Sequence, residues 1–538
     1  MGRGDCGGLG RYGGGIRDRQ LGRGEGMVWG LMDGKLKLRI AGLWAASFTI
    51  GPDVVGVGVL LAPMEATFEV SVSTVQWVVN AYAITFAMLI VTGGRLGDIF
   101  GRRRVLLAGL FFFAGASALN AMSQGIGWLV GARVLQGVGN ALLWPTAVGL
   151  MFASVPAHRS GIFIGVMFGL AGLGNVVGPI VGGAVADLGL EGWRWFFVFN
   201  LFTSGTAIAL LLLSGRADTD DDLKRERLDF PGIATLALGT FGFFYALDRA
   251  ATAGWGSGIV LGALGLFVVM YGVFFVIERR TPSALIPKPL WSNRSFLAAA
   301  MLNGLVMPAS FAMFMFVPQI GQKVWGLTDL RAALLLTPAM VMFAGSAPMA
   351  GHLYDKLGLK RLLWVGYGLC ATGSLWFALV DPSAGYLGWL LPAQLFVGLS
   401  IGIVVGPAGT AAVASVDGAN AGVASGIAFQ WHLVLGALGI ALATFFVTAQ
   451  MAAIVTADDA LGSAGTVDNE VVEAILADKP DAAALEGKVR AGELAKLKGE
   501  LSGAYLTGFR RAYWVCFGFA VLAFFLIPRV KERGKEAA

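Results

Sequence analysis

The stretch Gly94-Arg95-Leu96-Gly97-Asp98-Ile99-Phe100-Gly101-Arg102-Arg103-Arg104 separates two long apolar runs. Each run is long enough to cross a membrane, so the stretch is predicted to be a tight polar loop between two transmembrane helices. Its four arginines indicate the cytoplasmic side, where positive residues accumulate. An ordinary cytoplasmic loop would explain these arginines. It would not explain two glycines, an acid and a basic triplet at these spacings.

The overall composition is that of a protein that crosses a membrane many times. Hydrophobic residues make up 56% of the 538 residues and charged residues only 14%, far less charge than soluble proteins carry. The 79 glycines suit helices whose backbones approach closely in lipid. The lipid bilayer is therefore the expected surroundings. The net charge of +6 is spread over short loops, where it sets topology, and indicates no nucleic-acid partner.

The sequence contains no pattern typical of an enzyme or of a bound cofactor. It has no P-loop motif, which argues against ATP-driven transport, and no Cys/His spacing typical of a metal site. Cys6, Cys370 and Cys516 are too scattered for a disulfide framework and are predicted to be inert thiols. We expect no cofactor, no metal and no catalytic residues.

Apolar segments of about 18–25 residues recur along the chain, each long enough to cross the hydrocarbon core. Basic residues gather in alternate short loops between them, as cytoplasmic loops do. Lys35, Lys37 and Arg39 flank the first segment and place the N-terminus inside. An even number of spans returns the C-terminus to the same side. Fourteen spans are predicted, near 40–62, 76–97, 105–124, 127–151, 160–184, 195–214, 230–248, 257–277, 295–318, 331–352, 361–380, 386–407, 422–447 and 511–528.

The predicted fold is that of an all-α polytopic membrane protein with two six-helix bundles and two additional linking helices. Residues 1–34 are expected to be a disordered cytoplasmic tail or an over-extended start. A long loop before the last span is expected outside, as a solvated insertion, a lid or a partner surface. The predicted parts are the tail 1–39, the first bundle 40–214, the linker 215–294, the second bundle 295–528 with its loop 448–510, and the tail 529–538.

The opening stretch has a second copy later in the chain. Gly351-His352-Leu353-Tyr354-Asp355-Lys356-Leu357-Gly358-Leu359-Lys360-Arg361 has glycine, aspartate, glycine and basic residues in the same order. It follows the tenth span, the equivalent point of a second half if spans seven and eight are an insertion. Transporters built from two repeated halves bind substrate near the membrane midplane between them. The repeat therefore favours an alternating-access carrier over a channel.

Two charged residues are predicted to lie inside the membrane. Asp53 precedes Pro63, the outer end of the first span, by ten residues, which places it roughly 15 Å below the outer surface. Arg133 lies at a similar depth in the fourth span. A buried carboxylate is costly and indicates a functional site, here a proton acceptor. Arg133 would favour its charged form, so changing their separation would load and release a proton. A static pair that only positions helices is the alternative.

Several motifs resemble those of the major facilitator superfamily. The Gly94–Arg104 stretch resembles its loop between helices 2 and 3, and Arg133–Gly139 resembles the fourth-helix motif of its proton-coupled members. The segment Gly174-Asn175-Val176-Val177-Gly178-Pro179-Ile180-Val181-Gly182-Gly183 resembles the antiporter motif of its exporters. A plain packing face would explain these glycines but not the Gly-Pro and Gly-Gly pairs.

Two further segments are similar to the fourteen-helix drug:proton antiporters of that superfamily. They are Trp193–Asn200, at the entry to helix 6, and Asp229–Gly232, at the entry to the extra seventh helix. The resemblance covers the chain from about residue 40. It weakens where Val55 and Gly58 replace the family's usual Thr and Asn, and in the thirteenth span around His432.

The substrate cavity is predicted from polar and aromatic residues near the middle of several spans. His432 is either a second titrating group or substrate contact, or a hydrogen-bonded structural histidine. Asp248 and Arg249, at the outer end of the seventh span, are expected to be solvated. The predicted cavity residues are Asn80, Tyr82, Gln136, Phe314, Gln430 and His432.

The resemblance implies a secondary transporter of the inner (cytoplasmic) membrane. It would exchange protons for amphipathic organic compounds as a monomer, with both termini cytoplasmic and the proton gradient as its energy source. Asp53 would take the proton, and Gly178-Pro179 would help hold the exporter conformation. Asp98 would act at a cytoplasmic gate, near a helix end. The other predicted gate residues are Gly94, Gly101, Arg102, Arg103, Asp355 and Arg361. The alternatives are an exporter of one endogenous metabolite, peptide or lipid, and a non-transporting scaffold or sensor that uses the loop 448–510.

Overall fold

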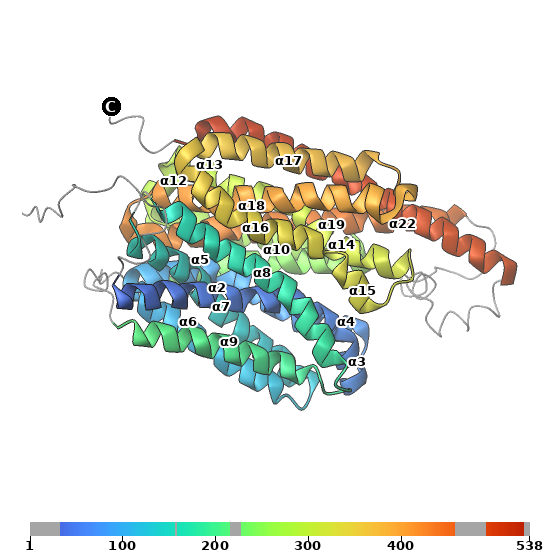
Figure 1. Ribbon diagram of the computed structural model, residues 1–538, viewed down its shortest axis with the longest axis horizontal. Helices are drawn as coiled ribbons and strands as arrows, with labels where there is room; N and C mark the ends of the chain where they lie inside the picture. The colour runs from blue at the N-terminus through green and yellow to red at the C-terminus, as the bar shows by residue number, and fades with distance from the viewer. Residues whose placement is uncertain (1–32, 157–158, 216–226, 458–490, 532–538) are drawn as a thin grey trace, which may run out of the picture.

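The computed structural model describes residues 33–156, 159–215, 227–457 and 491–531, and within these ranges it is helical without strands. Fourteen of its helices are long and apolar enough to cross a membrane, which confirms the predicted number of spans. The first described helix begins, and the last span finishes, at the same end of the molecule, on the left of Figure 1. We call this the terminal end and the opposite one the far end.

Six membrane-spanning helices form the N-terminal bundle. Two short helices, α3 (Leu61–Phe68) and α4 (Val72–Val75), lie at its far end (Figure 1). Pro52 lies inside the first helix and has no backbone N–H. The carbonyl one turn earlier therefore lacks its usual hydrogen-bond donor within the helix. The six long helices are α2 (Gly34–Val59), α5 (Trp77–Phe100), α6 (Arg102–Ala121), α7 (Ile126–Ser154), α8 (Ser160–Ala186) and α9 (Arg194–Leu213).

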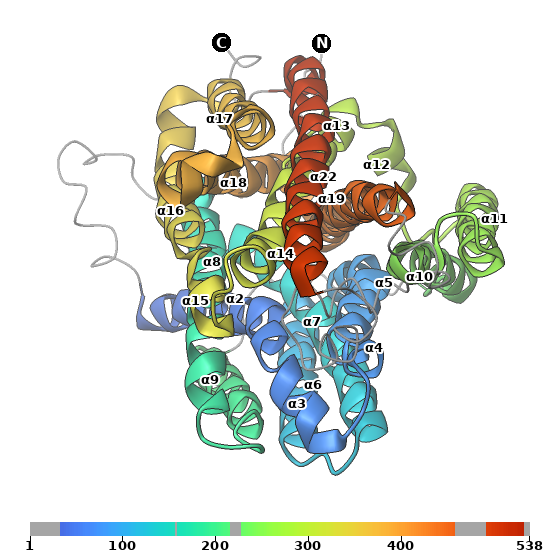
Figure 2. The same cartoon turned by 90° about the vertical axis from the view of Figure 1, so that its right-hand side faces the viewer.

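The C-terminal bundle contains six more spans, two of which are interrupted. The first breaks at Val306 before Pro308, because proline is tolerated in the first turn of a helix but not in its interior. Figure 2 shows this bundle beside the N-terminal one. Its helices are α13 (Arg294–Leu305) with α14 (Met307–Lys323), α15 (Asp329–Leu334) with α16 (Thr337–Leu357), α17 (Leu359–Leu379), α18 (Leu391–Ala414), α19 (Ala421–Ala457) and α22 (Ala491–Leu526).

The linker supplies the two extra spans, α10 (Phe230–Ala253) and α11 (Gly258–Arg280), and the short helix α12 (Lys288–Ser292). Asp229 caps α10 by accepting the N–H of Gly232 at 2.9 Å. Helix α10 packs against α5 of one bundle and α19 of the other, and α11 packs against α10 at the edge of the molecule (Figure 2).

The long loop predicted at 448–510 is shorter than expected. Helix α19 continues to Ala457 and α22 begins at Ala491, so both helices extend into the predicted loop. The hydrophobic run defined the membrane crossing but not the polar turns that continue each helix beyond it. The middle of this loop, the start of the N-terminal tail and most of the C-terminal tail lie outside the described residues.

Both copies of the repeated stretch form a helix, a glycine and a second helix. Gly101 joins α5 to α6 with φ 94°, and Gly358 joins α16 to α17 with φ 77°. A side chain is strained at these angles, so each tight turn requires glycine. The equivalent position of the two copies in the two bundles supports the predicted division into related halves.

Candidate functional site

Asp53 and Arg133 form an ion pair inside the N-terminal bundle. The Nη1 of Arg133 lies 2.7 Å from Oδ2 of Asp53, and both side chains have no solvent exposure. Asp53 comes from α2, directly after Pro52, and Arg133 comes from the far half of α7. Each charge offsets the cost of burying the other. The structure thus brings together the two residues for which proton chemistry is predicted.

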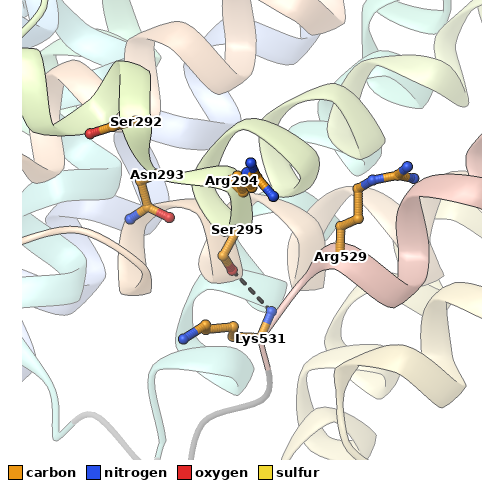
Figure 3. A pocket seen from close by; sticks show the side chains of 6 residues that line it. All are labelled: Ser292, Asn293, Arg294, Ser295, Arg529 and Lys531. Carbon is orange, nitrogen blue, oxygen red and sulfur yellow. Dashed lines mark hydrogen bonds between the residues drawn. The ribbon is translucent and has the colours of Figure 1, made fainter.

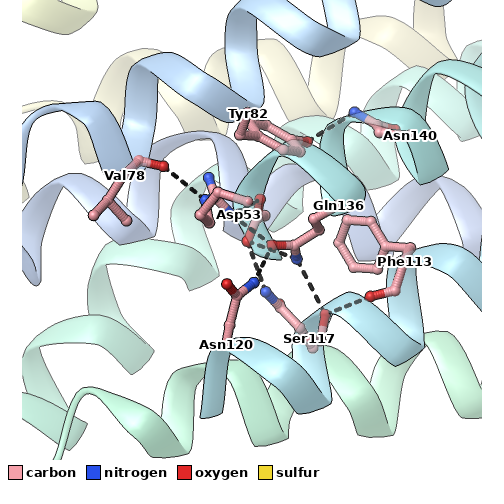
Figure 4. Close-up of polar contacts among 10 residues, drawn as sticks. Asp53, Val78, Tyr82, Phe113, Ser117, Asn120, Gln136 and Asn140 are labelled. Carbon is pink, nitrogen blue, oxygen red and sulfur yellow. Dashed lines mark hydrogen bonds and ion pairs between the residues drawn. The ribbon is translucent and has the colours of Figure 1, made fainter. Parts of the chain in front are cut away.

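Amide side chains surround this pair (Figure 4). Oδ1 of Asp53 accepts hydrogen bonds from Asn200 at 2.8 Å and from Gln136 at 3.3 Å. Gln136 Oε1 accepts from Arg133 at 2.7 Å and from Asn120 at 2.7 Å. Together with Arg133, these amides satisfy the polar atoms of the buried Asp53 side chain.

Arg133 has contacts besides the carboxylate. Its Nε donates to the carbonyl of Val78 at 2.8 Å, and its guanidinium carbon lies 4.3 Å from the centroid of the Tyr82 ring. Asn140 in turn donates to the Tyr82 hydroxyl at 2.8 Å (Figure 4). Helix α5 therefore holds the guanidinium through a backbone carbonyl and an aromatic face, independently of Asp53.

The glycines of the predicted antiporter motif allow α8 to pack closely against the part of α2 that carries Asp53. A Cβ on Gly174 would lie 2.7 Å from Pro52, and a Cβ on Gly178 would lie 2.5 Å from the Pro52 carbonyl. Gly182 faces Gly56 in the same way at 3.0 Å, and Gly183 is buried in α8. Pro179 lies inside α8 next to the contact. This glycine face positions the turn of α2 that carries Asp53.

Asp98 links the two bundles at the terminal end. Its carboxylate accepts the backbone N–H groups of Gly422 at 3.0 Å and Val423 at 2.8 Å, in the first turn of α19. Arg102 donates to Asp98 at 2.7 Å and also to the Gly418 carbonyl ahead of that helix. A carboxylate at a helix N-terminus satisfies donors that have no partner within the helix.

Two glycine contacts related by the repeat close the same end. A Cβ on Gly94 would lie 2.3 Å from the carbonyl oxygen of Gly422 in α19. A Cβ on Gly351 would lie 2.3 Å from the carbonyl oxygen of Gly161 in α8. The first glycine of each copy of the stretch thus lies against the second residue of a helix in the other bundle.

Three of the remaining predicted gate residues lie in a tight turn, in a contact within the N-terminal bundle and at an exposed position. Gly101 forms the tight turn, and Arg103 donates to the carbonyl of Leu211 in α9 at 2.8 Å, within its own bundle. Arg361 is exposed, and the side chain of Asp355 lies outside the described part of the chain. The second copy therefore contributes its glycine contact to the gate.

The predicted cavity residues fall into separate groups. Tyr82 and Gln136 belong to the Arg133 network. Asn80 donates to Asp248 at 2.6 Å, and Gln430 donates to Thr240 at 3.4 Å, so both contact the extra helix α10. The prediction that Asp248 is simply solvated is wrong, because this hydrogen bond joins α10 to α5.

Phe314 and His432 lie in an aromatic group between the bundles. The His432 ring stacks on Phe429 with centroids 4.5 Å apart and meets Phe311 edge-on at 5.7 Å. Phe314 packs against Phe311 at 6.1 Å. Trp144 of α7 lies 4.9 Å from Phe429, so aromatic rings of both bundles meet here.

Three residues of the Asp53 network were not predicted as site residues: Ser117, Asn120 and Asn200. Ser117 and Asn120 are fully buried on one face of α6, and Asn200 is fully buried in α9. A signal was present, since Ser117 and Asn120 are polar residues three apart within an apolar span. Their partner could not be read from spacing, because it lies on another helix.

Comparisons with known proteins agree with this architecture. Residues 43–444 match the family model of the Major Facilitator Superfamily. The chain is 32% identical over 435 residues to the puromycin resistance protein pur8 of Streptomyces alboniger, across 79% of the chain and 84% of that protein. It is 28% identical over 489 residues to the tetracenomycin C resistance and export protein of Streptomyces glaucescens, across 87% and 89%.

Solved structures support the fold. The human organic anion transporter MFSD10 (TETRAN) superposes with a TM-score of 0.58 at 14% identity, across 92% of this chain and all of that one. The proton:xylose symporter XylE superposes with a TM-score of 0.59 at 15% identity, across 93% and 96%.

Proposed function

Since the chain belongs to the major facilitator superfamily, we propose that it is a proton-coupled antiporter that exports amphipathic drugs across the cytoplasmic membrane. The observation that carries this proposal is the fully buried pair of Asp53 and Arg133. An ionisable carboxylate inside a membrane-spanning bundle is costly and marks a proton or ion pathway. The export direction and drug-like substrate rest on the relatives, whose names describe antibiotic resistance and export.

Proton exchange follows from how the pair is held. In the described state Asp53 is paired with Arg133 and shielded from solvent. A proton on Asp53 removes the attraction that joins α2 to α7, while Arg133 keeps the Val78 carbonyl, Gln136 and the Tyr82 ring. Protonation thus leaves Arg133 with hydrogen bonds but without a neutralising charge, which favours a movement of α2 away from this arrangement. The glycine face of α8 guides that movement.

Substrate binds between the bundles in this proposal, at the aromatic group around Phe429 and His432. Rings of α7 and α19 meet there, so a flat amphipathic molecule would contact both halves of the transporter. Movement of one bundle against the other then changes which side of the membrane the substrate reaches.

The terminal end is proposed to face the cytoplasm. It carries the basic residues of the Gly94–Arg104 stretch and of its second copy, as cytoplasmic loops do. Both termini are then cytoplasmic. Asp98, Gly94 and Gly351 form the cytoplasmic gate of a monomer, and this gate is closed in the described state.

Transport in proteoliposomes with puromycin as the probe tests this function. A pH difference of one unit, acid inside, should drive puromycin inward up to about tenfold per proton exchanged, because one unit corresponds to about 1.4 kcal/mol. Asp53→Asn should abolish this accumulation and retain exchange of labelled for unlabelled puromycin, which needs no net proton movement. Asp187→Asn, at the end of α8, is the matched control. Full gradient-driven accumulation by Asp53→Asn would refute the role of Asp53.

A further inference from the structure

A basic hollow lies at the terminal end of the C-terminal bundle, away from the ion pair and the gate. It has a volume of about 440 Å³ and lies where α12 ends, α13 begins and α22 finishes. Figure 3 shows its side chains. The lining residues are Ser292, Asn293, Arg294, Ser295, Arg529 and Lys531.

Among the described residues, the lining of this hollow is positively charged. Its six lining residues include three cations, Arg294, Arg529 and Lys531, and no acid. In Figure 3 these cationic side chains extend in different directions, and the Ser295 hydroxyl accepts the backbone N–H of Lys531 at 3.0 Å. Ser295 is buried, so this hydrogen bond holds the backbone at Lys531 against α13. The N-terminus of α13 adds partial positive charge.

Exposed apolar side chains lie near these cations in the chain, in α22 and α12. Phe525 is 67% exposed and Leu522 is 45% exposed in the last turns of α22, and Trp291 is 41% exposed next to Ser292. Helix α22 spans the membrane, so its outward apolar side chains contact acyl chains. A cationic lining and exposed apolar side chains therefore occur at the same end of α22.

We infer that this hollow binds the headgroup of an anionic phospholipid. The phosphate lies among Arg294, Arg529 and Lys531, and the acyl chains follow Phe525 and Leu522 along α22. A soluble phosphate would satisfy the cations and leave the apolar side unused, whereas a lipid satisfies both. The bound lipid joins the first and last helices of the C-terminal bundle and strengthens their contact.

Native mass spectrometry of the purified full chain tests this inference. Phosphatidylglycerol should bind in preference to phosphatidylcholine, and Arg294→Gln with Lys531→Gln should weaken that binding roughly thirtyfold, or about fivefold per charge removed. The matched control, Arg104→Gln with Arg280→Gln, removes two exposed charges from the same end outside the hollow. It should bind phosphatidylglycerol as the wild type does.

Three results would overturn the inference. They are an unchanged preference in the Arg294/Lys531 variant, an equal loss in the control variant, and displacement of the lipid by millimolar inorganic phosphate, which would indicate a soluble anion instead. Thermal unfolding gives a second readout. Added phosphatidylglycerol should raise the unfolding temperature of the wild type and the control, but not that of the Arg294/Lys531 variant.

Discussion

Gly94→Ala and Gly351→Ala are expected to hold the terminal gate open. The new Cβ would lie 2.3 Å from a carbonyl oxygen of the opposite bundle in each variant. An ordinary carbon–oxygen contact is about 3.3 Å, so the two helices must separate by roughly 1 Å. Overpacking of this kind costs about 1–3 kcal/mol. The gate-closed state alone bears this cost, so its population relative to the open state should fall by roughly 5- to 150-fold.

Gly345→Ala is the matched control for this experiment. Gly345 lies in α16, as Gly351 does, and no atom lies within 4 Å of its added Cβ. Alanine favours helix over glycine by about 1 kcal/mol at either position, so the control carries the same local gain without the clash.

Electron paramagnetic resonance can measure the opening directly. Spin labels at Phe100, the end of α5, and at Asp417, just before α19, report the distance across the gate in a background without native cysteines. Gly94→Ala and Gly351→Ala should enrich the longer distance and slow transport, whereas Gly345→Ala should match the parent. An unchanged distance distribution in both gate variants would refute the closed-gate interpretation of these contacts.

Two other predictions test the gate and the extra helices. Asp98→Asn removes the charge at the start of α19 and should slow transport severalfold, yet leave the pH dependence of substrate binding unchanged; a large shift in that dependence would assign proton chemistry to Asp98. Cysteines at Asn80 and Asp248, joined by a short cross-linker, should allow transport because α10 then moves with the N-terminal bundle. A cross-link between Thr240 and Gln430 should arrest transport, because α10, which Asn80 and Asp248 hold to α5, would then tie the two bundles together. Equal transport by both cross-linked proteins would contradict this assignment.

Much of the fold followed from local patterns. Hydrophobic length defined fourteen spans, and glycine and charge spacing in Gly94–Arg104 predicted the superfamily that the comparisons confirmed. Depth arithmetic along single helices placed Asp53 and Arg133 at matching levels, because helical rise is constant. The structure then showed their contact.

Other features depended on contacts between distant segments. Asn200 was not predicted as a site residue, although it lies in the Trp193–Asn200 motif. Its hydrogen-bond partner, Asp53, is 147 residues away in the chain, so no local pattern indicates the contact. Asn80 was predicted to line the cavity and instead joins α5 to α10. Side-chain type indicates that a buried polar group needs a partner, but only the packing of helices decides which partner is within reach.

The amino-acid sequence by itself determined the number of spans, the repeat of the Gly94–Arg104 stretch and the presence of Asp53 and Arg133 within spans. These properties depend on hydrophobic length and on charge in a medium without water, which act within each helix. Tertiary structure alone decided that Gly94 meets Gly422 while Gly351 meets Gly161, and that the end carrying them is closed. Such contacts arise from the crossing of helices of different bundles, which no local pattern encodes.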